Sequence, residues 1–215
     1  SDLSLAETSE QKSRAAFLDN GWNLVKATMA DRIELLRLAK EGPPPGTRER
    51  SVFFDACEGE GGGLPSGWGY WQRVGSKAKF AWDRQADEPS QGALRIAAAG
   101  SDGQPLCFLK KIPVEPRALY RARCRARTEA IDRDATVGVA MKWQDSTGKW
   151  MTQFPSVVSN LKQPAADGWQ MLDFYFRTPP LEQARLIYML SVEGATEGQV
   201  WFDDIQLGRI VVEEK

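Results

Sequence analysis

Apolar and polar side chains alternate with a period of two residues through much of the chain after residue 50. In YRARCRARTEA, residues 120–130, one face is Tyr120, Ala122, Cys124 and Ala126, and the other is Arg121, Arg123, Arg125 and Arg127. In ATVGVAMKW, residues 135–143, one face is Val137, Val139, Met141 and Trp143, and the other is Gly138, Ala140 and Lys142, followed by Gln144. A period of two is that of a β-strand with one buried face, so both segments are predicted to be strands.

Further segments extend this pattern to most of the chain. WQDSTGKW, residues 143–150, predicts a β-hairpin whose loop is Asp145 to Gly148 and which places Trp143 opposite Trp150. WQMLDFYFR, RLIYMLSVE and QVWFDDIQL predict additional short strands separated by turn residues. Many short strands with polar turns and little helix are typical of an antiparallel β-sandwich or barrel. We therefore expect a mainly β domain over residues 51–215.

The first 41 residues follow a different period. Apolar residues recur at spacings of three and four, which predicts an amphipathic helical extension over residues 1–41; the stripe is Leu18, Trp22, Val25, Met29, Ile33, Leu36 and Ala39. The segment GPPPG, residues 42–46, ends the helix and begins a stiff linker over residues 42–50. The stripe is expected to pack onto the β domain or onto a domain absent from this chain, and a self-associating helical pair is the alternative.

Charge and residue types exclude several classes of function. The formal net charge is −1 without any block of like charges, which argues against nucleic acid and anionic membranes as partners. The chain has no histidine, which excludes Ser-His-Asp and Cys-His nucleophiles and most zinc sites. Carboxylate-only chemistry, as in glycoside hydrolysis, remains open. No apolar run in the sequence is long enough to span a bilayer.

Cysteine usage and the first residue set further expectations. The three cysteines, Cys57, Cys107 and Cys124, are too few for a disulfide framework, so buried free thiols are expected, with a single bridge as the alternative. No signal peptide is visible, and Ser1 as the first residue indicates a processed protein or an excised piece of a longer one.

Two adjacent carboxylates, Asp203 and Asp204, interrupt the apolar stretch VWFDDIQLG. Neighbouring side chains of a strand point to opposite faces, so one of the two acids faces inward or lies at the rim of a sheet. A buried carboxylate is costly unless it is paired or bound to a cation. The pair therefore needs a partner, which the segment itself does not supply.

Several segments occur in an order that resembles a known family. They are FFDACEGEGGGLPSGWGYW, FAWD with QGALRI, KWQDSTGKW, DGWQMLDFYFRTPP and GQVWFDDIQL, and together they cover about Val52 to Ile210. This order is similar to that of the jelly-roll carbohydrate-binding modules grouped around families 4, 9 and 22. The resemblance implies a jelly-roll sandwich, and it does not extend to the helical residues before it.

The resemblance also implies a structural calcium ion that ties the first strand to the last. The matching carboxylates are Asp55, in FFD, and Asp203 or Asp204, with Glu58 as a further candidate. Calcium takes six to eight oxygen ligands, and its binding would favour the folded state by mass action. The alternative is a pair of aspartates bonded to loop amides or to arginine.

A glycan site of this kind lies on a concave sheet face or at the loop end. Aromatic rings pack on the apolar faces of sugars, and polar side chains bond the hydroxyl groups. The candidate platforms are Tyr70, Trp71, Trp82, Trp143 and Trp150, and the candidate polar contacts are Gln72, Lys142, Gln144 and Gln153. We expect Trp68, Trp169 and Trp201 in the core. Trp82 is expected either in the core or in the cleft. The small residues beside Lys142 leave room for a groove or belong to an ordinary polar face. The arginine row suggests an acidic polysaccharide, but a solvated face paired with nearby acids is the favoured interpretation.

The resemblance implies a non-catalytic carbohydrate-binding domain that targets a larger secreted polysaccharide-active protein to a β-linked glycan such as xylan or β-glucan. The expected partners are a polysaccharide or oligosaccharide and an adjoining catalytic domain, and the expected location is extracellular or at the cell surface. The alternative is a structural or interaction sandwich without a sugar groove, which docks through its N-terminal helices. A carboxylate-based glycosidase or lyase is a third hypothesis.

Overall fold

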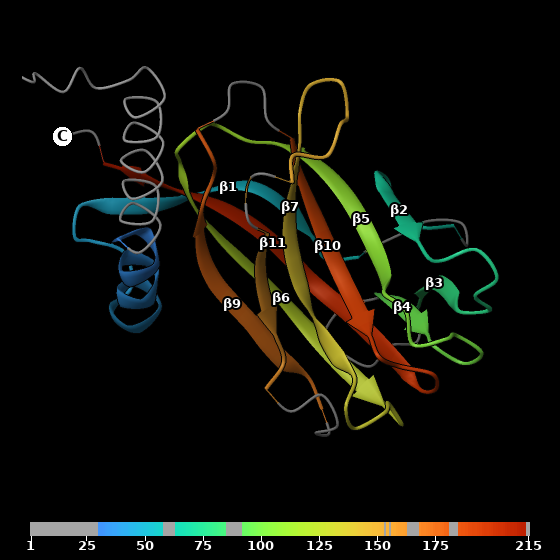
Figure 1. Cartoon of the computed structure of the whole chain (residues 1–215). Helices are drawn as coiled ribbons and strands as arrows, with labels where there is room; N and C mark the ends of the chain where they lie inside the picture. Colours follow the sequence, from blue (N-terminus) through green and yellow to red (C-terminus); the bar gives the residue numbers. More distant parts are fainter. Residues whose placement is uncertain are drawn as a thin grey trace, which may run out of the picture. The chain divides into compact units, whose positions relative to one another are not determined.

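The chain is mainly β, as the alternation predicts, and its strands form two antiparallel sheets (Figure 1). The computed structural model describes residues 30–57, 63–84, 92–152, 154, 156–162, 168–180 and 185–213. Within these residues there are eleven strands, and residues 30–41 form a helix. No helix in the described part of the chain combines the length and the apolar character that a membrane crossing requires.

The helix belongs to a compact unit of its own. The chain divides into residues 1–43 and residues 44–215, so the boundary falls within GPPPG. Gly42, with φ of 78°, ends the helix, and its N–H donates to the carbonyl of Leu38. Ile33 and Leu36 of the predicted stripe are exposed, whereas Leu38 is buried. The stripe residues before Ala30 lie outside the described residues, so the partner of the stripe stays a prediction.

The larger sheet contains six strands. Its order is β3 (Lys79–Asp83), β4 (Ala93–Ala97), β11 (Gln199–Val212), β6 (Leu119–Glu129) and β9 (Gln170–Arg177), and β1 (Thr47–Asp55) also pairs with β11. Because β1 begins at Thr47, the predicted linker over 42–50 is too long at its C-terminal end.

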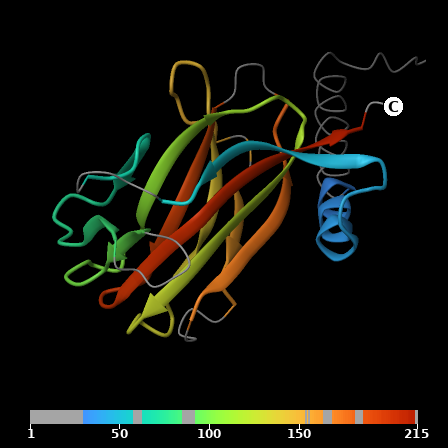
Figure 2. The same ribbon diagram turned by 180° about the vertical axis from the view of Figure 1, so that it is seen from behind.

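The smaller sheet contains five strands. Its order is β2 (Trp68–Trp71), β5 (Leu106–Pro113), β10 (Arg185–Glu193), β7 (Thr136–Gln144) and β8 (Val157–Asn160). The two sheets lie face to face in Figure 1, and Figure 2 shows the six-stranded sheet from behind.

The core lies between the sheets and uses the predicted faces. The inward residues of β6 are Tyr120, Ala122, Cys124 and Ala126, and those of β7 are Val137, Val139, Met141 and Trp143. Trp68 joins this cluster as predicted. All three cysteines are buried free thiols, so the alternative of one bridge is wrong.

Strand β11 changes neighbours halfway along its length. Residues 199–202 pair with β4, and residues 205–212 pair with β1 on the same side. The β6 side has a bulge between Asp203 and Gln206, and Asp204 has φ of 48°. A positive φ is strained for a residue other than glycine, so the surrounding contacts must hold Asp204 in place.

An arginine holds this junction together. Asp203 is fully buried, and its Oδ2 lies 3.1 Å from Nη2 of Arg125. Nε of Arg125 lies 2.9 Å from Oδ2 of Asp204, so one guanidinium contacts both carboxylates. The Oδ1 atom of Asp203 also accepts the N–H of Asp204 at 2.7 Å. The partner that the buried aspartate requires is therefore a cation of the neighbouring strand.

We expect Arg125→Ala to lower the free energy of unfolding by about 3–5 kcal/mol, because it leaves the Asp203 carboxylate buried without its cation. This corresponds to a fall in Tm of about 10 °C, measured by calorimetry or thermal circular dichroism. The matched control is Arg73→Ala, because Arg73 pairs with Asp102 on the exposed surface, where an ion pair contributes about 0.2–1 kcal/mol. Equal effects of the two substitutions would contradict the role given to Arg125.

Candidate functional site

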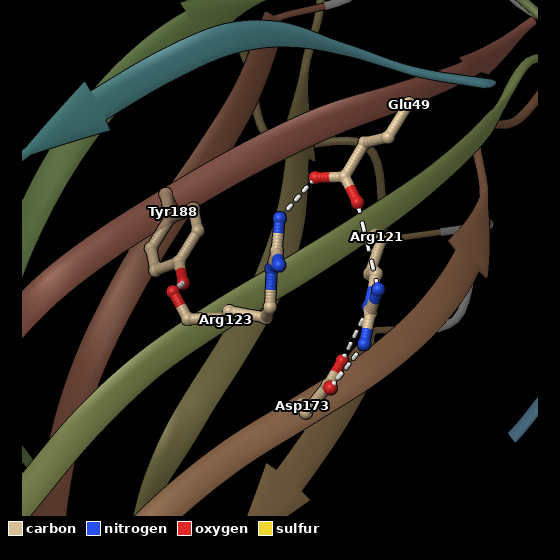
Figure 3. Close-up of polar contacts among 5 residues, drawn as sticks. All are labelled: Glu49, Arg121, Arg123, Asp173 and Tyr188. Atoms are coloured by element: carbon tan, nitrogen blue, oxygen red, sulfur yellow. Dashed lines mark hydrogen bonds and ion pairs between the residues drawn. The ribbon is translucent and has the colours of Figure 1, made fainter.

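The outward face of the six-stranded sheet carries the arginine row, and its charges are compensated. Arg121 donates from Nε and Nη2 to the two carboxylate oxygens of Asp173, at 2.8 and 2.6 Å. Arg121 also lies 3.6 Å from Glu49, and Arg123 forms an ion pair with the same Glu49 (Figure 3). The interpretation of this row as a face paired with nearby acids is confirmed for these two arginines.

The remaining two arginines of the row are engaged as well. Arg125 contacts Asp203 and Asp204. Arg127 lies over the ring of Trp201, at 4.5 Å, and near Trp169. Trp201 is buried as predicted but on the outward side of the sheet, where Trp169 packs against it. This face therefore offers little uncompensated charge for an acidic ligand.

The carboxylates predicted to bind calcium contact cations of the chain instead. Oδ2 of Asp55 accepts hydrogen bonds from Nε1 of Trp68 at 2.8 Å and from Nζ of Lys110 at 3.2 Å. Oδ1 of Asp55 accepts the N–H of Cys57 at 2.9 Å. The first and last strands of the sandwich pair with each other, and Asp55 lies opposite Ile205.

Calcium does not fit this arrangement of Asp55, Asp203 and Asp204. The N–H groups of Lys110 and Arg125 already point at their oxygens, and a metal ion would have to displace them. Among the described residues, no group of three or more His, Cys, Asp or Glu side chains is placed to hold a metal. Glu58 lies outside the described residues, so a calcium site that includes Glu58 stays a prediction.

The outward face of the five-stranded sheet is the better candidate for a ligand site. Gly138, Ser191, Cys107 and Trp71 form one row across β7, β10, β5 and β2. Four residues further along β7, Lys142, Ile187 and Lys111 form another row. Cys107 and Ile187 are buried although they point away from the core, so they form the floor of this face. Burial raises the pKa of the Cys107 thiol to about 11, so it stays protonated at neutral pH.

The predicted hairpin forms one end of this face, with a register that differs by one residue. Trp150 lies opposite Gln144, not opposite Trp143. The N–H of Gly148 donates to the carbonyl of Asp145, and Gly148 has φ of 89°, which makes a three-residue loop between Asp145 and Lys149. A shift of one residue moves a side chain to the other face of a strand. Gln144, rather than Trp143, therefore shares a face with Trp150.

Trp150 and Gln144 form an amphipathic pair. The hydrogen bonds from Met151 to Trp143 and from Asp145 to Lys149 flank them, so they are a non-hydrogen-bonded pair whose side chains are close. The indole of Trp150 is 47% exposed, whereas Gln144 is 7% exposed. The side-chain oxygen of Gln144 is buried and accepts no hydrogen bond from the described residues. An exposed ring thus lies beside an acceptor to which no described residue donates.

The diagonally opposite corner of the face has similar chemistry. Trp71 is 48% exposed on β2, and from the strand spacing and residue rise it is on the order of 25 Å from Trp150. The side-chain oxygen of the next residue, Gln72, is also buried without a hydrogen bond among the described residues. Between the two corners Gly138 is required, because a Cβ there would lie 2.2 Å from the side-chain oxygen of Asn160.

The structure brings together only part of the predicted site. Trp71, Lys142, Gln144 and Trp150 share the outward face, but Trp143 is 3% exposed and packs on Phe176 in the core. The prediction that Trp143 is a sugar platform is therefore wrong.

Two other predicted aromatic platforms lie outside this face. Trp82, on the other sheet, is half-buried, and its Nε1 donates to the carbonyl of Cys57. Tyr70 is exposed but points to the other side of β2 from Trp71, where it stacks on Phe80 with ring centroids 4.6 Å apart. Gln153 lies outside the described residues.

Sequence reasoning missed Lys111 and Arg185. The alternation in RLIYMLSVE already indicated that Arg185, Ile187, Met189 and Ser191 share a face. The pairing of β10 with both β5 and β7, which brings Arg185 opposite Gln144, joins segments far apart in the sequence. Local patterns carry no signal for that pairing.

Comparison with known proteins shows the fold. No protein-family model and no curated protein sequence matches the chain. Three solved structures are similar. An arabinose-bound α-L-arabinofuranosidase, MgGH51, matches with TM-score 0.54, 12% identity and coverage of 78% of this chain and 28% of that chain. The enzymatically active domain of tailspike protein 4 of bacteriophage CBA120 matches with TM-score 0.52, 15% identity and coverage of 67% of this chain and 19% of that chain.

The third similar structure is the CBM22-1–GH10 part of Clostridium thermocellum xylanase 10B in complex with xylohexaose. Its TM-score is 0.50 and its identity 14%, and the match covers 74% of this chain and 28% of that chain. The chain thus spans 19 to 28% of the length of these three proteins. The jelly-roll fold implied by the resemblance is confirmed.

We expect removal of calcium by a chelator to leave the Tm of the protein unchanged within about 1 °C. Lys110 and Arg125 already occupy the carboxylate oxygens of Asp55, Asp203 and Asp204, so these oxygens do not bind the metal. Differential scanning fluorimetry with calcium and with EDTA measures this. A stabilisation by calcium that disappears in both Asp55→Asn and Asp204→Asn would instead establish the predicted metal site.

Proposed function

We propose that the sandwich is a non-catalytic carbohydrate-binding domain that holds a glycan on the outward face of its five-stranded sheet. The observation that carries this proposal is the pairing of the exposed Trp150 indole with the buried oxygen of Gln144, which has no hydrogen-bond donor among the described residues. A sugar ring presents an apolar C–H face to an indole and hydroxyl donors around its rim. A hydroxyl entering beside Trp150 supplies the donor that Gln144 lacks, which relieves a cost of about 1–3 kcal/mol.

The shape and spacing of the face suit an extended chain rather than a single sugar. Trp71 offers a second exposed indole at the far corner, and the rows between carry small or flat residues such as Gly138 and Ala140. A chain that spans both corners gains two weak contacts that act as one. We propose a β-linked backbone, in line with the xylohexaose bound by the xylanase 10B fragment.

Catalysis by this face is disfavoured by its composition. The five strands of the sheet contain one acidic residue, Glu193, at the end of β10. Hydrolysis by paired carboxylates needs two acids about 5–10 Å apart. We therefore propose that an adjoining catalytic domain of a larger, secreted protein acts on the glycan, while this domain raises its local concentration on the polymer.

An interaction domain without a glycan is the second candidate. Ile33 and Leu36 of the helix are both about two-thirds exposed, at 65% and 67%. Exposed apolar side chains on one helix can contact a partner protein. This function needs no ligand on the five-stranded sheet, so the two candidates differ in a measurable way.

The test is native affinity electrophoresis through a panel of soluble xylans, β-glucans, mannans and pectins. We expect retardation by at least one polymer and a loss of about tenfold in affinity in Trp150→Ala, because ring stacking is removed. Trp71→Ala should weaken binding to long chains more than to short oligosaccharides, since only long chains reach both corners.

The matched control is Phe54→Ala, because Phe54 is an exposed aromatic residue on β1 of the other sheet. Each variant is first shown to be folded by its near-ultraviolet circular dichroism. Retardation that survives in Trp150→Ala and Trp71→Ala would place the ligand elsewhere. No retardation of the folded wild type by any polymer would favour the interaction domain.

A further inference from the structure

Three cations surround the Trp150 end of the proposed binding face. Lys111 and Lys142 lie on either side of Ile187 in one row, so their Cα atoms are about 10 Å apart from the strand spacing. Arg185 is two residues from Ile187 on β10 and lies directly opposite Gln144. Two residues along a strand are about 7 Å. The three side chains therefore form one patch, which also includes the amide of Gln144.

None of the three cations forms an ion pair with an acid among the described residues. All three residues are exposed, and no carboxylate of a residue that the structure describes lies within 4 Å of their nitrogens. Glu193, the acid within these five strands, is six residues along β10 from Ile187, or about 20 Å. The arginines of the other sheet differ sharply, because Glu49 and Asp173 neutralise Arg121 and Arg123.

Three acids are close in sequence to the patch: Glu115 pairs with Arg209, Glu182 lies outside the described residues, and Asp145 is engaged in its own turn. Asp145 follows Gln144, and its Oδ1 accepts hydrogen bonds from the N–H and hydroxyl of Thr147 and from the N–H of Lys149. These bonds lower the pKa of the Asp145 carboxyl, so it is charged and held in the hairpin loop. It is therefore engaged as an acceptor away from Lys142.

The charge of Lys142 acts along the face and not only at its own position. Cys107 lies in the row of Trp71, four residues from Lys111 on β5. The ammonium of Lys142 lowers the pKa of that thiol, against the larger opposite effect of burial. This places positive potential between the two tryptophan corners, where the glycan chain would run.

We propose that the ligand of this face is an acidic glycan, whose carboxylates are bound by Lys142, Arg185 and Lys111 while Trp150 packs on a sugar ring. This inference rests on the proposed function, since it names the chemical class of the same ligand. Arg185 can bind a uronate carboxylate through two parallel N–H···O bonds, and the lysines bind as point charges. The patch is too short for nucleic acid, which requires a longer track of phosphate contacts.

The test compares one polymer with its own uncharged form. Glucuronoxylan is used as prepared and after chemical reduction of its carboxylates to primary alcohols, which leaves the backbone unchanged. Isothermal titration calorimetry with oligosaccharides from both forms should show binding to the acidic form that is about tenfold tighter. The preference should fall as salt is added, because exposed charges are screened.

Variants assign the preference to the patch. Lys142→Gln and Arg185→Gln should each weaken binding to the acidic form by about fivefold and leave binding to the reduced form unchanged. The matched control is Arg48→Gln, since Arg48 is an exposed arginine of β1 on the other sheet. Arg48→Gln should change the affinity for neither the acidic nor the reduced form.

The outcomes separate the two proposals. Equal binding of the acidic and reduced forms, with loss in Trp150→Ala, would overturn the acidic ligand and support the carbohydrate-binding face. Binding to polyglutamate as tight as to the acidic glycan, unaffected by Trp150→Ala, would overturn both, because charge alone would explain it. No binding of either form, of alginate or of polygalacturonate would overturn the acidic glycan as well.

Discussion

The contact between Arg125 and the buried carboxylate of Asp203 is the interaction on which the larger sheet depends. Asp203 lies at the point where β11 exchanges one neighbour, β4, for another, β1. The bulge beside it and the positive φ of Asp204 interrupt the regular pairing there. A junction of this kind leaves polar groups within the sandwich, and the cation of Arg125 on β6 compensates the charge of the buried acid. The arginine row of β6 is thus part of how the sheet closes around β11.

This internal compensation gives the two outward faces different characters. On the six-stranded sheet each described arginine of the row meets an acid or an aromatic ring, and the face is balanced by its own residues. On the five-stranded sheet the strands supply cations, exposed indoles and amides but almost no acids. The first surface is balanced by its own side chains, whereas the second carries polar groups that have no partner among the described residues. A similar fold in unrelated proteins would not predict this difference, because it depends on side chains.

Sequence patterns predicted the strands and their buried faces well, because the period of two follows directly from β geometry. The faces of β6 and β7 are those read from Tyr120 to Arg127 and from Val137 to Gln144. The hairpin register was off by one residue, since it depends on the positive φ of Gly148 in the loop. That error placed Trp143, instead of Gln144, opposite Trp150. Arg185 and Lys111 join the site through long-range strand pairing, which no local pattern contains.

The ribbon of β1 and β11 has a mechanical consequence. Thr47 lies directly opposite Val212, so the two ends of the sandwich leave from the same end of one antiparallel pair (Figure 2). Hydrogen bonds in such a pair run perpendicular to the strands. Tension applied between these two ends acts along the bonds and opens them one after another, whereas tension along the strands would load them all together. When the two ends are pulled apart, β1 therefore separates from β11 before the five-stranded sheet is disturbed. The binding face stays folded at a force that has already detached the first strand.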